Sequence, residues 1–376
     1  MNARVLGIEA STIRALHARR RPSSIDLGLG QPTLAPEVAD FEAATRWVAA
    51  NGCAYSSNAG DEELRAAIAG HYGYPGLDRA ENVCITTGSQ EAVYVAIKTV
   101  LDPGRDELLV VEPAFPIYAK VAQMEGIAVR RVSMRADRDF GFDAERILEA
   151  IGPATRLVVI CSPCNPTGKV IAGATVRAIA SALLDRPGPP VYVLHDEIYR
   201  EQVYVDDKGE VGRHYPYTIA VNSLSKSNAL TGLRIGWVLA PADVAGHVVK
   251  AHGWVTSCAS TFGQRVALEI FRRDGLGAHR SWYARQRDAA VALARATGLR
   301  FVEPDGAFYL CLRLGVPDSR GFCFALLEHE DVVAVPGRLF DEALEGWVRT
   351  SFVGTPDAIG EGYRRIAAYA AAPAKA

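Results

Sequence analysis

The chain has 376 residues, of which 49% are hydrophobic and 22% charged, and its 41 basic side chains nearly balance its 43 acidic ones. The formal net charge of −2 gives no strong field for nucleic acid or an anionic membrane, so we expect a small-molecule ligand. No apolar run reaches the roughly 18 residues of a membrane span, and we expect no signal peptide. Seven dispersed cysteines are typical of reduced thiols and predict a cytoplasmic protein.

The length favours two domains, and strand-like and helix-like segments alternate as far as about residue 260. Amphipathic segments such as 89–101 separate short apolar runs, several of them apolar throughout, as in strands buried on both faces. This alternation predicts an α/β fold whose large domain has a mostly parallel seven-stranded sheet between helices. The predicted strands are 83–87, 107–111, 127–134, 157–162, 191–195, 219–223 and 234–239.

The pattern changes beyond about residue 260, where helical segments flank four further strand candidates. This part predicts a smaller α+β domain, and the opening residues are too few for a domain of their own. We therefore expect an N-terminal arm over 1–35 that wraps onto a neighbour or onto the small domain, a large domain over 36–260 and a small domain over 261–376. The later strand candidates are 299–302, 307–314, 332–335 and 347–352.

Ligands of α/β sheets bind beyond the carboxyl ends of the strands, and unusual residues follow four of the predicted strands. After the first, Gly88 and Ser89 open a helix whose free N–H groups can cradle a phosphate, although this motif taken alone favours plain helix capping. After another, a turn between two prolines presents the amide of Asn165, and a simple Pro/Gly turn is the alternative. The overlapping pair Cys161 and Cys164 has no second ligand pair, which disfavours a zinc or redox site.

The other two strand ends have ionisable residues. Asp196 ends a buried strand, where a carboxylate is costly unless paired. A protonated pyridine nitrogen would pair with it and stay cationic, able to absorb electrons from a carbanion, whereas a surface helix cap is the alternative. Lys226 lies among small hydroxyl residues, with Arg234 eight positions later. Lysine forms Schiff bases when deprotonated, and a cationic site favours that state, while Arg234 and the serine hydroxyls suit a dianionic phosphate.

Together these motifs resemble the class I/II aminotransferase family of fold-type I pyridoxal-phosphate enzymes. The segment from Ser223 to Gly236 resembles the lysine signature of that family, and the motifs follow the family's order over most of the chain. The resemblance implies that pyridoxal 5'-phosphate is bound, with Lys226 at its aldehyde carbon and Asp196 at its ring nitrogen. Asn165 and Tyr199 would bind its phenolic oxygen, and Phe115 would stack on the ring.

The resemblance also implies a homodimer with its active site at the subunit interface, where Tyr55 reaches the neighbour's phosphate. Lys226, Asp196 and Tyr199 would be the catalytic residues. The remaining phosphate contacts would come from Gly88, Ser89, Gln90, Ser223, Ser225 and Arg234. The substrate would meet Gly30, Asn165 and Arg349, with Arg349 holding the α-carboxylate and with Gly306 and Tyr309 as further candidates for the pocket wall.

The implied activity is transfer of an amino group from an α-amino acid to a 2-oxo acid through a Lys226 Schiff base, with no metal. Relatives that use aspartate have a lysine in the phosphate loop where this chain has Ser89, which favours a neutral, aromatic or cationic substrate. Another reaction of the same cofactor, such as elimination, cyclisation or oxidation, stays open. A non-catalytic sensing domain is less favoured, because the stretch before Gly30 is too short for a DNA-binding module.

Overall fold

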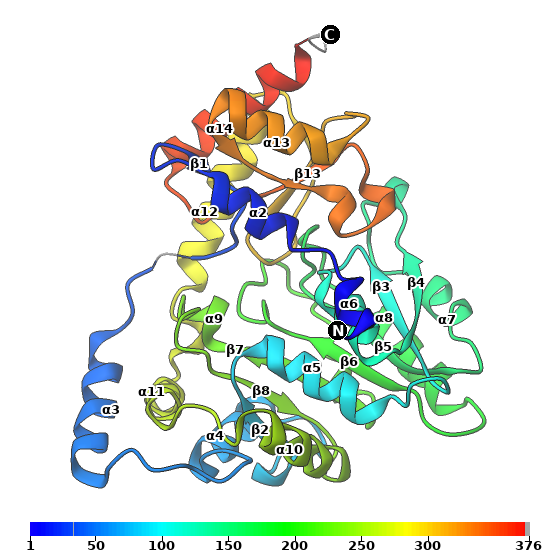
Figure 1. Cartoon of the computed structure of the whole chain (residues 1–376), viewed down its shortest axis with the longest axis vertical. Coiled ribbons are helices and arrows are strands. Elements are labelled where there is room, and N and C mark those ends of the chain that lie inside the picture. Colours follow the sequence, from blue (N-terminus) through cyan, green and yellow to red (C-terminus); the bar gives the residue numbers. More distant parts are fainter. Residues whose placement is uncertain (33, 373–376) are drawn as a thin grey trace.

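A computed structural model of the chain describes residues 1–32 and 34–372. Its central sheet has seven strands in the order β2-β8-β7-β6-β5-β3-β4 (Figure 1). β8 alone runs opposite to the other six strands, which confirms the predicted mostly parallel seven-stranded sheet. The strands are β2 (Val83–Thr86), β3 (Glu107–Glu112), β4 (Ala128–Ser133), β5 (Thr155–Cys161), β6 (Tyr192–Asp196), β7 (Thr218–Ser223) and β8 (Gly236–Leu239).

The sheet is buried on both faces, as the continuous apolar runs predict. In β5, Leu157 and Val159 pack into the core on one face, and Val158 and Ile160 pack into the core on the other. Successive strand residues point to opposite faces, so a strand in the middle of three layers needs apolar residues at every position. Burying each such side chain stabilises the fold by roughly 1.5–3 kcal/mol.

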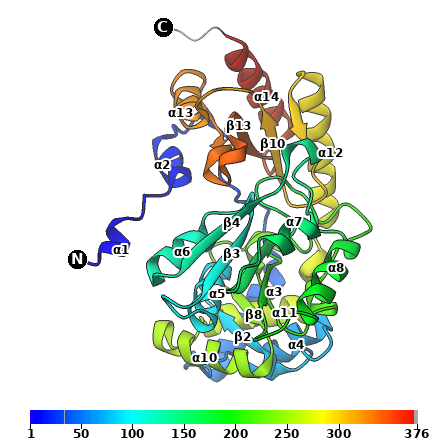
Figure 2. The same cartoon turned by 90° about the vertical axis from the view of Figure 1, so that its right-hand side faces the viewer.

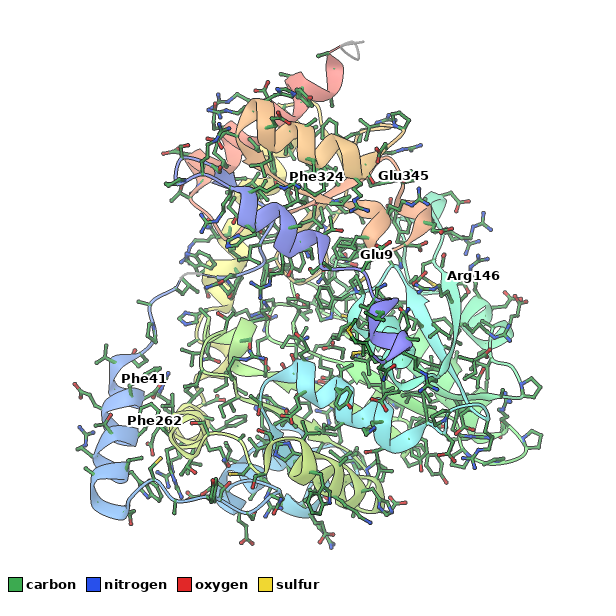
Figure 3. The ribbon with its side chains drawn as sticks, viewed as in Figure 1. Glu9, Phe41, Arg146, Phe262, Phe324 and Glu345 are labelled. Atoms are coloured by element: carbon green, nitrogen blue, oxygen red, sulfur yellow. The ribbon has the colours of Figure 1, made fainter. Side chains whose placement is uncertain are left out.

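Helices cover both faces of the sheet. One face packs against α5 (Ser89–Val100), α6 (Ile117–Glu125) and α10 (Ala242–Thr256). The opposite face packs against α4 (Glu62–Tyr72), α7 (Ala144–Glu149), α8 (Gly173–Leu184) and α11 (Thr261–Arg272). Outside them, α3 (Val38–Asn51) lies along α11, where the rings of Phe41 and Phe262 have their centroids 6.4 Å apart and their planes tilted by 53° (Figure 3).

A smaller domain lies above the carboxyl-terminal edge of the large sheet (Figures 1 and 2). Its antiparallel sheet has the order β12-β13-β10-β9. The strands are β9 (Arg300–Val302), β10 (Tyr309–Arg313), β12 (Val335–Pro336) and β13 (Trp347–Ser351), and the helices are α12 (Arg280–Ala296), α13 (Ser319–Glu330) and α14 (Pro356–Ala371). None of the described helices combines the length and apolar character that a bilayer crossing requires.

The N-terminal segment joins the small domain through backbone pairing. Its helices α1 (Ala3–Leu6) and α2 (Thr12–Arg19) precede β1 (Ile25–Asp26), which pairs in parallel with β11 (Val332–Val333). The run predicted as one strand at 332–335 is therefore two, because β11 pairs with β1 while β12 pairs with β13. The single-strand prediction was wrong there, since an apolar run does not reveal a change of partner.

The cores into which α11 and α12 pack indicate where the large domain ends and the small domain begins. Helix α11 contributes Val266 and Leu268 to the core that contains Trp237 of β8, whereas α12 contributes Tyr283 to the core of the small domain. We propose that the chain passes to the small domain between α11 and α12 rather than at residue 260.

Candidate active site

Lys226 lies at the carboxyl end of β7, on the one-turn helix α9 (Leu224–Ser227). The hydroxyl of Ser223 caps this turn by accepting a hydrogen bond from the N–H of Ser225 at 3.2 Å. The Nζ of Lys226 donates to the carbonyl oxygen of Gly30 at 2.6 Å. Burial, and then the positive charges of Arg349, Arg234 and Arg14, lower the pKa of Lys226 from 10.5 to about 8. An appreciable fraction of this amine is therefore neutral, and nucleophilic, near neutral pH.

Asp196 ends β6 and is almost completely buried. Its Oδ1 accepts a hydrogen bond from the N–H of Ile198 at 3.1 Å, and its Oδ2 accepts one from the hydroxyl of Tyr118 at 2.6 Å. Burial raises the pKa of Asp196, and these two hydrogen bonds oppose the rise. The sequence alone indicates no role for Tyr118, because only the packing of α6 against the sheet brings it to Asp196.

Arg349 comes from β13 of the small domain and is 2% exposed. Its Nη1 donates to Oδ1 of Asn165, which lies after β5, at 3.0 Å, and its Nη2 donates to the carbonyl oxygen of Gly28. Within the described part of the chain, nothing accepts a hydrogen bond from its Nε. The structure thus brings Arg349 and Asn165 together across the two domains. It leaves the buried Nε of Arg349 without a hydrogen-bond partner among the described residues.

Two buried tyrosines join the same cluster. The hydroxyls of Tyr199 and Tyr309 lie 2.9 Å apart, and burial is the largest cause of a raised pKa in both. The ring of Tyr309 lies under the guanidinium of Arg349, 4.3 Å from ring centroid to Cζ. A Cβ at Gly30 would come within 2.2 Å of the Tyr309 hydroxyl oxygen, so only glycine fits there.

The predicted phosphate loop is compact and faces Arg234. Gly88 has a φ of +83°, a conformation that favours glycine, and it caps α5. A Cβ on it would lie 2.3 Å from Nη2 of Arg234, which donates to the carbonyl of Thr87 at 3.2 Å. The N–H groups of Ser89 and Gln90 belong to the first turn of α5, where a helix has no acceptors of its own. The guanidinium of Arg234 therefore lies beside the first turn of α5, whose N–H groups have no acceptor within the helix.

The remaining predicted residues lie in different surroundings. Phe115 is half-buried between the cores on the two faces of the sheet, just beyond the end of β3. Tyr55 is 88% exposed and does not join the cluster of its own chain. Cys161 and Cys164 are buried free thiols, and no group of potential metal ligands was found among residues 1–32 and 34–372.

Residues 23–366 match the model of the family described as aminotransferase class I and II. The chain belongs to this family. The resemblance expected from the motifs is confirmed, and it extends over nearly the whole chain.

Several family members are similar along their full length. An aspartate aminotransferase of Pyrococcus horikoshii is 34% identical over 96% of this chain and 95% of its own. A probable N-acetyl-LL-diaminopimelate aminotransferase of Bacillus subtilis is 34% identical over 97% and 94%. The solved structure of an aspartate aminotransferase from Thermus thermophilus with maleate matches the fold with a TM-score of 0.91, at 29% identity, over 98% of this chain and 99% of that one. The fold predicted from the sequence is thus that of aminotransferases.

Proposed function

We propose that this chain is a pyridoxal 5'-phosphate-dependent aminotransferase that moves the amino group of an α-amino acid to a 2-oxo acid. The observation that carries the proposal is a continuous set of contacts around one lysine of lowered pKa. Lys226 touches Gly30, Gly30 packs against Tyr309, and Tyr309 touches both Tyr199 and Arg349. A nucleophilic amine and a clamp for a carboxylate are therefore held in one buried place.

The residues present fit the cofactor. Arg234 and the first turn of α5 offer charge-assisted and backbone hydrogen bonds to a dianionic phosphate. The buried carboxyl of Asp196 suits a protonated ring nitrogen, and Asn165 and Tyr199 suit the phenolic oxygen. Lys226 is the amine for the aldehyde. Each chemical group of the cofactor thus has a residue of matching chemistry.

When bound, the cofactor supplies an electron sink for a carbanion at the substrate Cα. Arg349 binds the α-carboxylate through the paired N–H groups of its guanidinium, which fixes the direction of the Cα–H bond. The neutral Nζ of Lys226 accepts the α-proton as general base and later returns it. Asp196 would keep the ring nitrogen protonated, and the hydroxyl of Tyr199 would donate a hydrogen bond to the phenolic oxygen.

A homodimer is part of the proposal. Tyr55 and Trp254 are 88% and 89% exposed, and exposed apolar side chains that gather in one patch, as these two do, mark contact surfaces. The two segments adjoin, because a Cβ on Gly253 would lie 2.3 Å from Nδ2 of Asn58. We infer that a second copy covers this patch and that Tyr55 of each subunit reaches the phosphate of the other. The seven free cysteines support a cytoplasmic location.

The donor class follows from the charges near the site. Ser89 offers no cation for a side-chain carboxylate at the phosphate loop, so we expect neutral, aromatic or cationic donors to be used in preference to aspartate.

The test supplies the purified protein with cofactor, one amino acid and one 2-oxo acid. Transamination predicts a new amino acid and a new 2-oxo acid in equal amounts, with no ammonia. Ammonia that is released without an amino acceptor would identify an elimination or an oxidation instead and would overturn the proposal.

A further inference from the structure

Tyr309 lies where the N-terminal segment, the large domain and the small domain meet. It is 2% exposed and belongs to β10. Its hydroxyl contacts that of Tyr199, which follows β6, and its ring lies under Arg349 of β13. The same ring occupies the space that a side chain at Gly30 would fill, since a Cβ there would lie 2.9 Å from two of its carbon atoms. One side chain therefore contacts three residues of the proposed site.

The hydroxyl of Tyr309 determines how the proton of Tyr199 can be used. Each phenol has one proton to donate, and the raised pKa of both keeps both protonated near neutral pH. One of the two protons is used in the hydrogen bond between them. Within the described residues, the Tyr199 hydroxyl has no other partner. If Tyr199 is to donate to the cofactor's phenolic oxygen, Tyr309 must therefore be the donor to Tyr199.

This arrangement also changes the strength of Tyr199 as a donor. A hydroxyl that accepts a hydrogen bond is polarised and donates its own proton more strongly. A stronger donor at the phenolic oxygen stabilises the ionised form of that oxygen and lowers the pH at which the bound cofactor loses its proton.

The ring of Tyr309 acts on Arg349 instead. The guanidinium carbon lies 4.3 Å from the centroid of Tyr309 and 5.1 Å from that of Phe340, so two aromatic rings contact the cation. Such contacts are worth more when they are buried, as they are here, and they restrict the orientation of the guanidinium plane. Because the orientation of the guanidinium is already restricted, Arg349 loses less conformational entropy when it binds a carboxylate.

We propose that Tyr309 is a positioning residue with two separable parts: its hydroxyl directs and strengthens the donation by Tyr199, and its ring orients Arg349 for the α-carboxylate. The inference rests on the proposed function and deepens it. The two parts are separable because phenylalanine keeps the ring and removes only the hydroxyl.

The role of the hydroxyl is tested with Tyr309→Phe, by measuring the visible absorbance of the bound cofactor as the pH is varied. The midpoint of this pH titration should rise by on the order of half a pH unit, and by less than in Tyr199→Phe. Binding of an α-methyl amino acid, which has no α-proton, should be unchanged. Tyr363→Phe is the matched control, because its buried hydroxyl lies 3.3 Å from that of Thr350, and its midpoint should stay at the wild-type value.

The ring is tested with Tyr309→Met, and with Tyr309→Leu as a second variant if the first does not fold. The Kd for the α-methyl amino acid should rise roughly tenfold in a variant without the ring, whereas it stays unchanged in Tyr309→Phe. If Tyr309 had a role in folding alone, its variants would be less stable. Tyr309→Phe would then not shift the titration midpoint while leaving the Kd for the α-methyl amino acid unchanged.

The outcomes distinguish this inference from the function on which it rests. A wild-type protein that binds no pyridoxal phosphate would overturn both. The role of Tyr309 would be overturned if the wild type binds the cofactor and Tyr309→Phe has the same titration midpoint as the wild type. It would also be overturned if the variant without the ring has the wild-type Kd. Either result would leave the aminotransferase proposal standing.

Discussion

Arg349 of the small domain and Asn165 of the large domain are joined by a hydrogen bond of 3.0 Å between Nη1 and Oδ1. Both side chains are buried, so the bond operates in a medium of low polarity where charge-assisted contacts are strong. In the proposed enzyme, Arg349 binds the substrate and Asn165 binds the phenolic oxygen of the cofactor. The bond therefore connects the two ligands through the protein.

Replacing Arg349 tests the substrate clamp. Lysine keeps the charge in Arg349→Lys but loses the planar fork that binds a carboxylate in two places. We expect kcat/KM for the amino donor to fall roughly 100-fold, mostly through KM. Steady-state kinetics measure this change, and Arg338→Lys, at an exposed ion pair with Glu345, is the control. An Arg349→Lys variant with the kinetics of Arg338→Lys would rule out the clamp.

Asp196→Asn tests the partner of the ring nitrogen. An amide cannot keep that nitrogen protonated, so the electron sink weakens and kcat should fall by on the order of 100- to 1000-fold. Stopped-flow absorbance should show the loss in the proton-transfer step. The exposed Asp137→Asn serves as the comparison and should react at the wild-type rate. Equal rates for the two variants would mean that Asp196 is structural.

The lowered pKa of Lys226 predicts how uptake of the cofactor depends on pH. At a pH below this pKa of about 8 most of the amine is protonated and not nucleophilic, and at a higher pH most of it is neutral. The rate at which apoprotein combines with pyridoxal phosphate should therefore rise about tenfold per pH unit below that value and level off above it. Rapid-mixing absorbance gives the profile. A midpoint near 10.5, the ordinary value for lysine, would contradict the effect of burial and of the neighbouring arginines.

Trp254→Glu tests the dimer. A charge on the exposed patch should prevent a second copy from packing there. Sedimentation should show a monomer, and activity should be lost because Tyr55 no longer reaches its partner's site. Leu184→Glu changes a side chain that is 53% exposed at the end of α8, and it should leave the assembly intact. A monomeric wild type, or a Trp254→Glu variant that stays dimeric and active, would refute this interface.

Much of the fold could be predicted because its signals are local. Each strand of the large sheet has its own apolar run, and Asp196 and Lys226 each follow such a run directly. The contacts of Tyr118 and Tyr309 could not be predicted in this way, since they join residues 78 and 110 positions apart. Likewise, the split of 332–335 into β11 and β12 depends on which strands lie beside them. A continuous apolar run in the sequence does not distinguish one buried strand from two short consecutive ones.

The central claim is that Lys226 binds the cofactor covalently. Reduction of the wild-type complex with borohydride, followed by mass spectrometry of its peptides, tests this claim directly. We predict one modified peptide, with the added mass on Lys226, and a Lys226→Ala protein that gains no mass and has no turnover. Modification at another lysine, or turnover that persists in Lys226→Ala, would contradict the account.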